Sequence, residues 1–220
     1  MLTPGILTVI STPKQSEDAA ESFEYECIEA HRGRREFLEG GGASIVSHEH
    51  FHAKSDQRAL DLYELENVEP ILAGNILLEE GGEGPVAEAN SYAYKLLRSS
   101  FYNGDYRINA DLAIVSMEPP LMNLDEMNRW YEEEHLSLLN KVPGYLSSLR
   151  GSLLWQSSKT GRTTPKYAAF HRFAPDNGLN TSQEWKNAES TEWAQHIRSV
   201  VQQQGHLTWT HWTYVESSRT

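Results

Sequence analysis

The sequence is poor in the features that mark secreted and membrane proteins. Its 220 residues include one cysteine, Cys27, so an intrachain disulfide is excluded and a reducing compartment is favoured. No apolar run approaches the length of a membrane span, and residues 1–12 carry no charged leader and too short an apolar stretch for a signal peptide. We therefore predict a cytoplasmic protein.

Basic residues are also scarce. Nineteen Lys and Arg stand against 31 Asp and Glu, which gives a formal net charge of −12. A negative field of this size repels phosphate backbones and anionic lipids, so neither a nucleic acid nor a membrane is expected as a partner. The glycine motifs that bind nucleotide phosphates do not occur, nor does the G-x-S-x-G turn of many hydrolases, so we predict no cofactor.

The sequence does contain ample apolar content, 39%, arranged in strand and helix patterns. β-Branched and alternating runs predict strands at 5–12, 43–53, 59–66, 111–119, 145–157, 166–174 and 206–215. Capping signals and helical spacing predict helices at 16–38, 87–100, 123–142 and 182–204. Residues 101–109 fit a strand or an irregular segment, and the glycine- and glutamate-rich residues 79–85 fit a poorly ordered loop.

The two halves of the chain repeat one another. Each half has the pattern β-α-β-β-α-β, and residues 6–11 match residues 112–117 at an offset of about 105. Four more matches keep the same order: Glu29-x-His31 with Glu133-x-His135, Gly40 with Gly144, Tyr63 with Tyr167, and Leu97-Arg98-Ser99 with Ile197-Arg198-Ser199. Because one such ferredoxin-like unit leaves an apolar sheet face to be buried, we predict an α+β fold in which two ferredoxin-like repeats, 1–109 and 110–220, bury those faces against each other.

The most informative segment runs from Asn123 to Tyr145. Asn123 or Asp125 can cap its start, and Pro143-Gly144 ends the helix. An apolar stripe predicts the face that packs on a core: Met127, Trp130, Tyr131, Leu138, Leu139 and Val142. Tyr131 and His135 are four residues apart and therefore neighbours, with Glu134 beside them. A phenol, an imidazole and a carboxylate are thus expected at the rim of the buried face.

The string from Asn128 to Gly144, N-x-W-Y-x-x-E-H-x-x-L-L-x-x-V-P-G, resembles the first-helix signature of dimeric α/β-barrel proteins, specifically their EthD-like branch. Those proteins usually have a proline shortly after the histidine, where this chain has Ser137. The resemblance implies two ferredoxin-like sheets closed face to face, here fused in one chain that can also form a homodimer. It also implies that a small ligand binds in the crevice between helix and sheet, beside the tyrosine and the histidine.

This resemblance implies a cofactor-independent enzyme of secondary metabolism that cyclises, decarboxylates, isomerises or oxygenates a hydrophobic aromatic or polyketide-like molecule. We expect His135 to act as general acid or base, Tyr131 to hydrogen-bond a ligand oxygen, and Glu134 to orient the histidine. The candidate substrate-binding residues are Trp130, Trp209, Trp212, His171 and His211. All six tryptophans lie in the second half, so we expect the ligand site there and not at His31, the counterpart of His135.

Other interpretations stay open. His135 fits an exposed helix histidine as well, and the aromatic residues fit a large core. The chain also fits a non-catalytic small-molecule-binding or stress-related protein, because one fold hosts many functions. A third alternative is a metal-dependent enzyme, since His48, His50 and His52 alternate along a strand, although a barrel-lining stripe explains that spacing too.

Overall fold

The computed structural model describes residues 2–13, 23, 34, 36–53, 56, 58–73, 86–101, 110–158, 163–203 and 207–219. Several sequence-based predictions fall outside these residues. They concern His31 and Cys27, most of the helix predicted at 16–38, the acidic loop 79–85, and most of 101–109.

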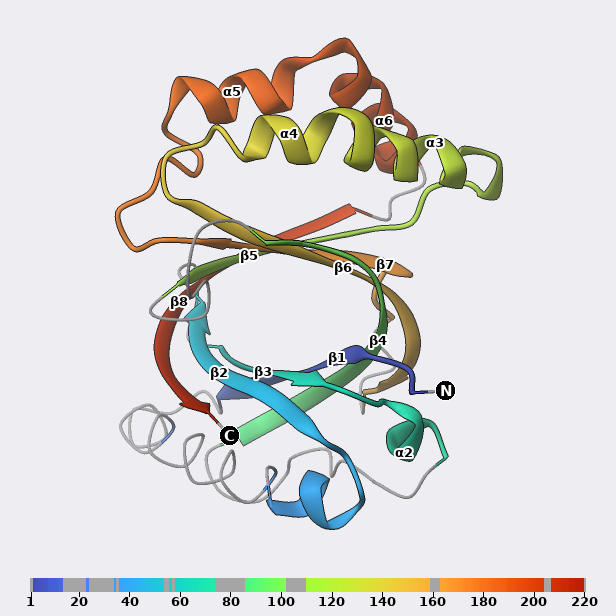
Figure 1. Cartoon of the computed structure of the whole chain (residues 1–220), viewed down its shortest axis with the longest axis vertical. Coiled ribbons are helices and arrows are strands. Elements are labelled where there is room, and N and C mark those ends of the chain that lie inside the picture. The colour runs from blue at the N-terminus through green and yellow to red at the C-terminus, as the bar shows by residue number, and fades with distance from the viewer. Residues whose placement is uncertain are drawn as a thin grey trace. The chain divides into compact units, whose positions relative to one another are not determined.

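Eight strands pair into one closed barrel. They are β1 (Gly5–Pro13), β2 (Ile45–Ala53), β3 (Ala59–Leu65), β4 (Val86–Phe101), β5 (Asp111–Met117), β6 (Tyr145–Ser157), β7 (Tyr167–Phe173) and β8 (Leu207–Arg219), all labelled in Figure 1. Their hydrogen-bonded order is β1-β3-β2-β8-β5-β7-β6-β4. The first four strands therefore stand in the order β4-β1-β3-β2 and the last four in the order β8-β5-β7-β6, which is the ferredoxin-like order in both cases. The predicted fold class is confirmed.

The strand registers correct one of the predicted repeat matches. Ile6 pairs with Glu64 across β1 and β3, and Leu112 pairs with Arg172 across β5 and β7. The offset between halves therefore grows from 106 in the first strand to 108 in the third. Tyr63 thus corresponds to His171 and not to Tyr167, because the connection between the second and third strands is longer in the second half.

The prediction of a helix at 87–100 was wrong. These residues belong to β4, which pairs antiparallel with β1 from Lys95 opposite Gly5 to Val86 opposite Pro13. Alanine and tyrosine at this spacing fit a helix or a buried strand, and pairing with a distant segment decides between them. The predicted repeat match between residues 97–99 and residues 197–199 therefore compares residues of a strand with residues of a helix. A short helix, α2 (Glu69–Leu72), lies where no element was predicted.

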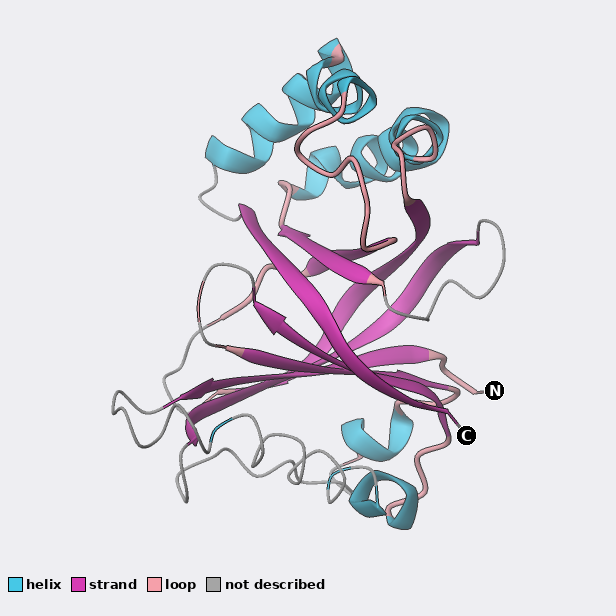
Figure 2. Cartoon of the chain, turned by 90° about the vertical axis from the view of Figure 1, so that its left-hand side faces the viewer, coloured by secondary structure: helices cyan, strands magenta, loops and turns pink. Residues whose placement is uncertain are grey.

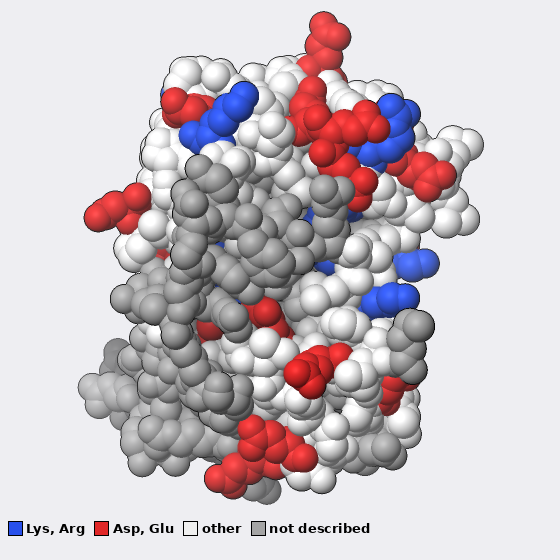
Figure 3. All heavy atoms as spheres, viewed as in Figure 1, with Lys and Arg blue, Asp and Glu red and all other residues white. Residues whose placement is uncertain are grey.

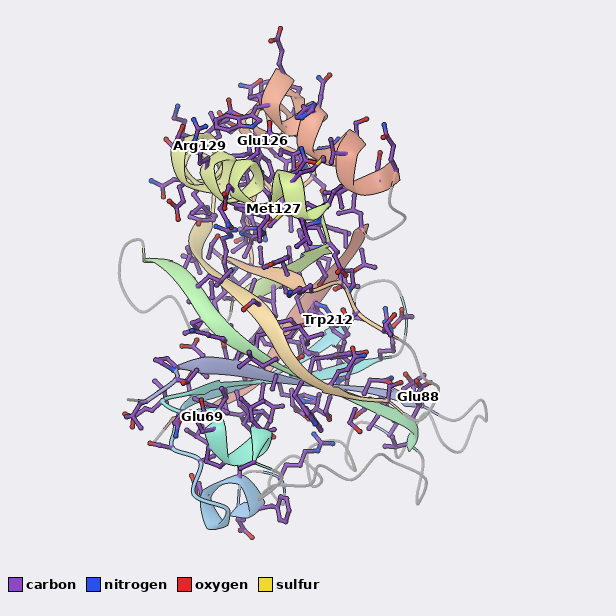
Figure 4. All side chains as sticks on the ribbon, turned by 90° about the vertical axis from the view of Figure 1, so that its right-hand side faces the viewer. Glu69, Glu88, Glu126, Met127, Arg129 and Trp212 are labelled. Carbon is purple, nitrogen blue, oxygen red and sulfur yellow. The ribbon has the colours of Figure 1, made fainter. Side chains whose placement is uncertain are left out.

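The segment predicted as one helix at 123–142 consists of several pieces. A 3-10 turn, η1 (Leu121–Asn123), leads into α3 (Leu124–Trp130), a π-helical turn η2 (Tyr131–His135) and α4 (Leu136–Leu139). Asn123 holds the N-cap position but makes no side-chain capping bond to a backbone amide. The predicted apolar face is confirmed: five of its six residues are buried and Leu138 is partly buried. In Figure 4, Met127 lies on the strand side of this helix and Arg129 on the other side.

The helix predicted at 182–204 is likewise divided, into α5 (Gln183–Ser190) and α6 (Glu192–Gln203). Thr191, with ψ 153°, is extended and breaks it. Ser182 caps α5 by accepting a 3.1 Å hydrogen bond from the Trp185 amide, and Thr191 accepts one of 3.0 Å from the Ala194 amide at the start of α6. Figure 2 shows that these helices and α3–α4 cover the same side of their strands.

The chain divides into two compact units. The first contains Met1–Leu97, Gly151–Thr163 and Trp212–Thr220, and the second contains Arg98–Arg150 and Thr164–His211. The boundary predicted between residues 109 and 110 stays a prediction. Among the described residues, no helix is both long enough and apolar enough to cross a membrane.

Candidate active site

The second unit contains a cavity of about 330 Å³ between its helices and its strands. Its walls are largely apolar and aromatic, with contributions from the strands β5, β7 and β8 and from the helical segments α3, η2, α5 and α6. The residues around it that carry chemistry are Trp130, Tyr131, His135, His171, Glu189 and Arg198. A volume near the lower end of ligand pockets suits a small molecule of two or three rings.

The π-helical turn places the aromatic groups at this cavity. The His135 ring stacks on Trp130 with centroids 4.1 Å apart, and the Tyr131 ring meets it edge to face at 5.3 Å. Such single π-turns inside α-helices are frequent at functional sites. Three acidic residues of the segment from α3 to α4 point to solvent and not to the cavity: Asp125, Glu132 and Glu133 are exposed. Figure 3 shows acidic side chains gathered over the helices of this unit.

His135 is buried, not at the rim as predicted, and the alternative of an exposed helix histidine is wrong. Burial, the nearby His171 and the positive charge of Arg198 lower its pKa well below 6.5. The ring is therefore neutral at pH 7. The Ala188 backbone acts in the opposite direction and favours the protonated ring. Nδ1 is buried and has no hydrogen-bond partner among the described residues, so it is the ring nitrogen that a ligand can meet.

His171 is the second imidazole at the cavity, with its centroid 6.2 Å from that of His135. Burial, together with the charge of Arg150, lowers its pKa to about 3, so it too is neutral. Its Nδ1 lies 2.5 Å from the Ser148 hydroxyl, which lies 2.6 Å from the Tyr145 hydroxyl. Its Nε2 is buried, with no hydrogen-bond partner among the residues that the structure describes.

Tyr131 is held by a buried cation. The Arg150 guanidinium lies 4.0 Å from the centre of the Tyr131 ring and donates a 2.6 Å hydrogen bond to the Asn128 side-chain oxygen. Burial raises the pKa of Tyr131 to about 12. Its phenol therefore stays protonated and can serve only as a neutral hydrogen-bonding group.

An ion pair stands beside the aromatic part of the cavity. Arg198, from α6, donates to the Glu189 carboxylate and, at 3.3 Å, to the Glu189 backbone carbonyl on α5. Burial raises the pKa of Glu189, whereas the charge of Arg198 opposes that rise. Arg198 and Glu189 therefore place a paired cation and carboxylate at the cavity wall.

The remaining predicted site residues are distributed as follows. Trp209 lines the cavity, and so do Trp130 and His171. Glu134 does not line it; its carboxylate accepts a 2.7 Å hydrogen bond from the Thr191 hydroxyl and so joins α5–α6 to the π-helical turn. His211 lies outside the lining, 3.5 Å from an Asp111 carboxylate oxygen. Trp212 belongs to the first unit, where it is fully buried and lies under the Arg58 guanidinium.

The histidine stripe of β2 lies in the first unit. His48 stacks on Tyr63 at 4.3 Å, and His50 Nδ1 lies 2.6 Å from Asp61, which also pairs with Arg34. Over the part of the chain that the structure describes, no three His, Cys, Asp or Glu side chains are grouped to hold a metal ion. The histidine stripe of β2 therefore belongs to a buried polar network. The described residues give no support to the metal-dependent alternative.

Comparison with known proteins rests on structure alone. No family model matches the sequence, and no curated protein matches it. An anthrone oxidase-like protein is similar with a TM-score of 0.62 at 9% identity, over 98% of this chain and 93% of that chain. A proposed monooxygenase from Lactobacillus acidophilus has a TM-score of 0.58 at 9% identity, over 99% and 96%. One from Fusobacterium nucleatum has 0.54 at 10% identity, over 100% and 95%.

The chain has the dimeric α+β barrel fold. In this dimeric α+β barrel, the residues that contact His171 and Tyr131 from β6 were not among the sequence-based predictions. Ser148 and Arg150 stand two residues apart on β6, so they share one face of a strand that is buried throughout this stretch. Two polar residues at that spacing in a buried strand were a signal that could have been used. Glu189 and Trp185 carried no comparable signal, because the break at Thr191 that separates α5 from α6 was not predicted.

Proposed function

We propose that this protein is an enzyme that oxygenates a small, hydrophobic, aromatic ketone or phenol of polyketide type, and that His135 removes the proton that starts the reaction. The observation that carries the proposal is the Nδ1 atom of His135, which is buried at an aromatic cavity, on a neutral ring, without a hydrogen-bond partner among the described residues. In the proposal this nitrogen carries the lone pair. The similarity to an anthrone oxidase-like protein and to proposed monooxygenases supports the choice of oxygenation among the reactions considered. The Asn128–Gly144 string supports placing the chain in the EthD-like branch.

The proposed chemistry needs dioxygen and no cofactor. His135 Nδ1 takes a proton from an acidic C–H next to the ring system, and the electron pair left on carbon delocalises onto the ketone oxygen. Dioxygen adds to that carbon, and the proton returns from His135 to give a hydroperoxide. Loss of water from the hydroperoxide leaves a new C=O group. One O2 is consumed and one H2O released for each CH2 converted to C=O.

The protein contributes position, desolvation and an unprotonated base. Stacking on Trp130 and the edge contact with Tyr131 hold the imidazole in one orientation. The apolar walls exclude water from the carbanion before dioxygen reaches it. Tyr131, protonated and held against Arg150, is available as a hydrogen-bonding group for a substrate oxygen.

Anthrone is the probe for the first test, because its methylene is acidic and its product is a quinone. Wild-type protein should accelerate O2 uptake over the rate in buffer, with one O2 consumed per quinone formed. His135→Ala should lower the rate by ~100-fold or more, and added imidazole should restore part of it by entering the vacated space. His196→Ala is the matched control, since His196 lies on α6 with its side chain 53% exposed and outside the cavity lining. Tight binding of anthrone without turnover would instead support the non-catalytic binding protein.

A further inference from the structure

Tyr145, Ser148 and His171 form a buried chain of hydrogen bonds in which the direction of each bond can be worked out. The Tyr145 phenol is a donor that must be satisfied, and burial raises its pKa, so it stays protonated. Its one hydrogen-bond partner among the described residues is the Ser148 hydroxyl, at 2.6 Å. Tyr145 therefore donates to Ser148.

The next bond follows from the first. Because the Ser148 oxygen accepts from Tyr145, its own hydrogen is available for His171 Nδ1, 2.5 Å away. Nδ1 accepts that hydrogen and so carries none itself. In a neutral imidazole the hydrogen then resides on Nε2. The buried serine and tyrosine thus set the tautomer of His171.

The Nε2–H group that results is directed at the cavity. His171 lines the cavity whereas Ser148 does not, so Nδ1 points away from it and Nε2 is the nitrogen left for a ligand. This group is fully buried and has no acceptor among the described residues. A buried N–H donor without an acceptor is rare in folded proteins and is expected where a ligand supplies the missing oxygen.

We infer that His171 is the oxyanion-binding residue of this site, donating from Nε2–H to the ketone or phenol oxygen of the substrate, with Ser148 and Tyr145 as its positioning residues. The inference rests on the proposed function for the identity of that oxygen. His135 presents a lone pair and His171 presents a hydrogen, with ring centroids 6.2 Å apart. A molecule in the cavity that lies against both rings can lose a proton to one ring while its oxygen gains negative charge beside the other.

The ligands chosen for the test are 1-tetralone and tetralin, which differ by one carbonyl oxygen that accepts but does not donate. Equilibrium binding of both to wild type and to His171→Phe gives a tetralone-to-tetralin affinity ratio for each protein. This ratio should fall about tenfold in His171→Phe, in line with the loss of one buried hydrogen bond. A ratio that survives the substitution would overturn the assignment.

The tautomer is tested separately by 15N NMR of histidine-labelled protein, with the His171 signals assigned by their loss in His171→Phe. Wild type should show the neutral Nε2–H form. Ser148→Ala should shift His171 toward the Nδ1–H form and lower the affinity ratio. Ser147→Ala is the matched control, because Ser147 is the neighbouring buried serine on β6 and has no hydrogen-bond partner among the described residues. An Nδ1–H form in wild type, or equal effects of the two serine substitutions, would refute the hydrogen-bond directions assigned to Tyr145, Ser148 and His171.

Both measurements are independent of turnover. If anthrone is not oxidised while the affinity ratio and the tautomer behave as expected, the proposed reaction fails and the oxygen-binding role of His171 stands. If anthrone is oxidised and the ratio is unchanged in His171→Phe, the reaction stands and the role of His171 fails.

Discussion

Trp130 and His135 stack face to face, with ring centroids 4.1 Å apart and planes 26° apart, although they are five residues apart along one helical segment. In an α-helix of 3.6 residues per turn, residues i and i+5 point about 140° apart. The π-helical turn from Tyr131 to His135 places one extra residue in a turn and brings i and i+5 together. It therefore lets both Trp130 and Tyr131 contact one imidazole.

The first prediction ranks three substitutions by their effect on anthrone oxidation. His135→Ala should cost the most, because it removes the base. Tyr131→Phe should cost less, roughly tenfold or below, since the ring remains stacked under Arg150 and only a neutral hydroxyl is lost. His31→Ala should leave the rate nearly unchanged. Steady-state O2 uptake measures all three, and an equal loss for His31→Ala and His135→Ala would contradict a site confined to the second half.

The second prediction concerns stability against pH. The pKa of His171 is about 3 in the folded protein and about 6.5 in an unfolded chain, so below pH 6.5 the unfolded state binds a proton that the folded state does not. The stabilising contribution is complete above pH 6.5 and is lost as the pH falls toward 3. Between pH 7 and pH 5 the contribution of His171 to the free energy of unfolding should fall by an amount on the order of 2 kcal/mol.

Urea unfolding at pH 7 and pH 5 measures that loss. His171→Phe should show a smaller decrease in unfolding free energy between the two pH values than wild type does. His196→Ala should show the wild-type decrease, because His196 is largely exposed. Parallel decreases in wild type and His171→Phe would mean that His171 titrates normally.

The third prediction concerns the Glu189–Arg198 pair at the cavity. Removing the carboxylate charge by Glu189→Gln leaves Arg198 to attract an anion. Binding of 2-naphthoate should then tighten by roughly tenfold, corresponding to about 1.4 kcal/mol, and weaken again in high salt. Naphthalene binding should change little and serves as the reference. Arg198→Gln should abolish the gain, and an unchanged naphthoate affinity in Glu189→Gln would show that Arg198 does not face the ligand.

The fourth prediction concerns the turn between α4 and β6. Gly144 has φ +80°, and a Cβ added there would lie 2.7 Å from Asn177 Cβ and 2.9 Å from Asn177 Cα. Gly144→Ala should destabilise the protein by more than ~2 kcal/mol, because it combines left-handed strain with a steric clash. Gly40→Ala is the control, since nothing lies within 4 Å of its added Cβ. Thermal unfolding that gives the two variants the same stability would contradict this account.

Residues close together in the chain were enough to predict much of this protein. The apolar stripe of residues 127–142 and the alternation of β1, β2, β3 and β5–β8 express helical and strand periodicities, which depend on local geometry. The repeat then implied two equivalent sheets, and the strand order confirms them. The pairing of Tyr131 with His135 followed from spacing alone, because four residues make about one turn.

Only the tertiary structure decided which groups from distant parts of the sequence surround His135. Residues 87–100 became a strand because β1 supplies hydrogen bonds to them, a contact that no local pattern encodes. The depressed pKa of His135 arises from burial and from His171 and Arg198, which are 36 and 63 residues away in sequence. The Tyr145–Ser148–His171 chain joins two strands, so its bond directions exist only once β6 and β7 lie side by side. Local periodicity specifies which face of an element is buried, whereas the partners that a buried polar group meets depend on packing between distant segments.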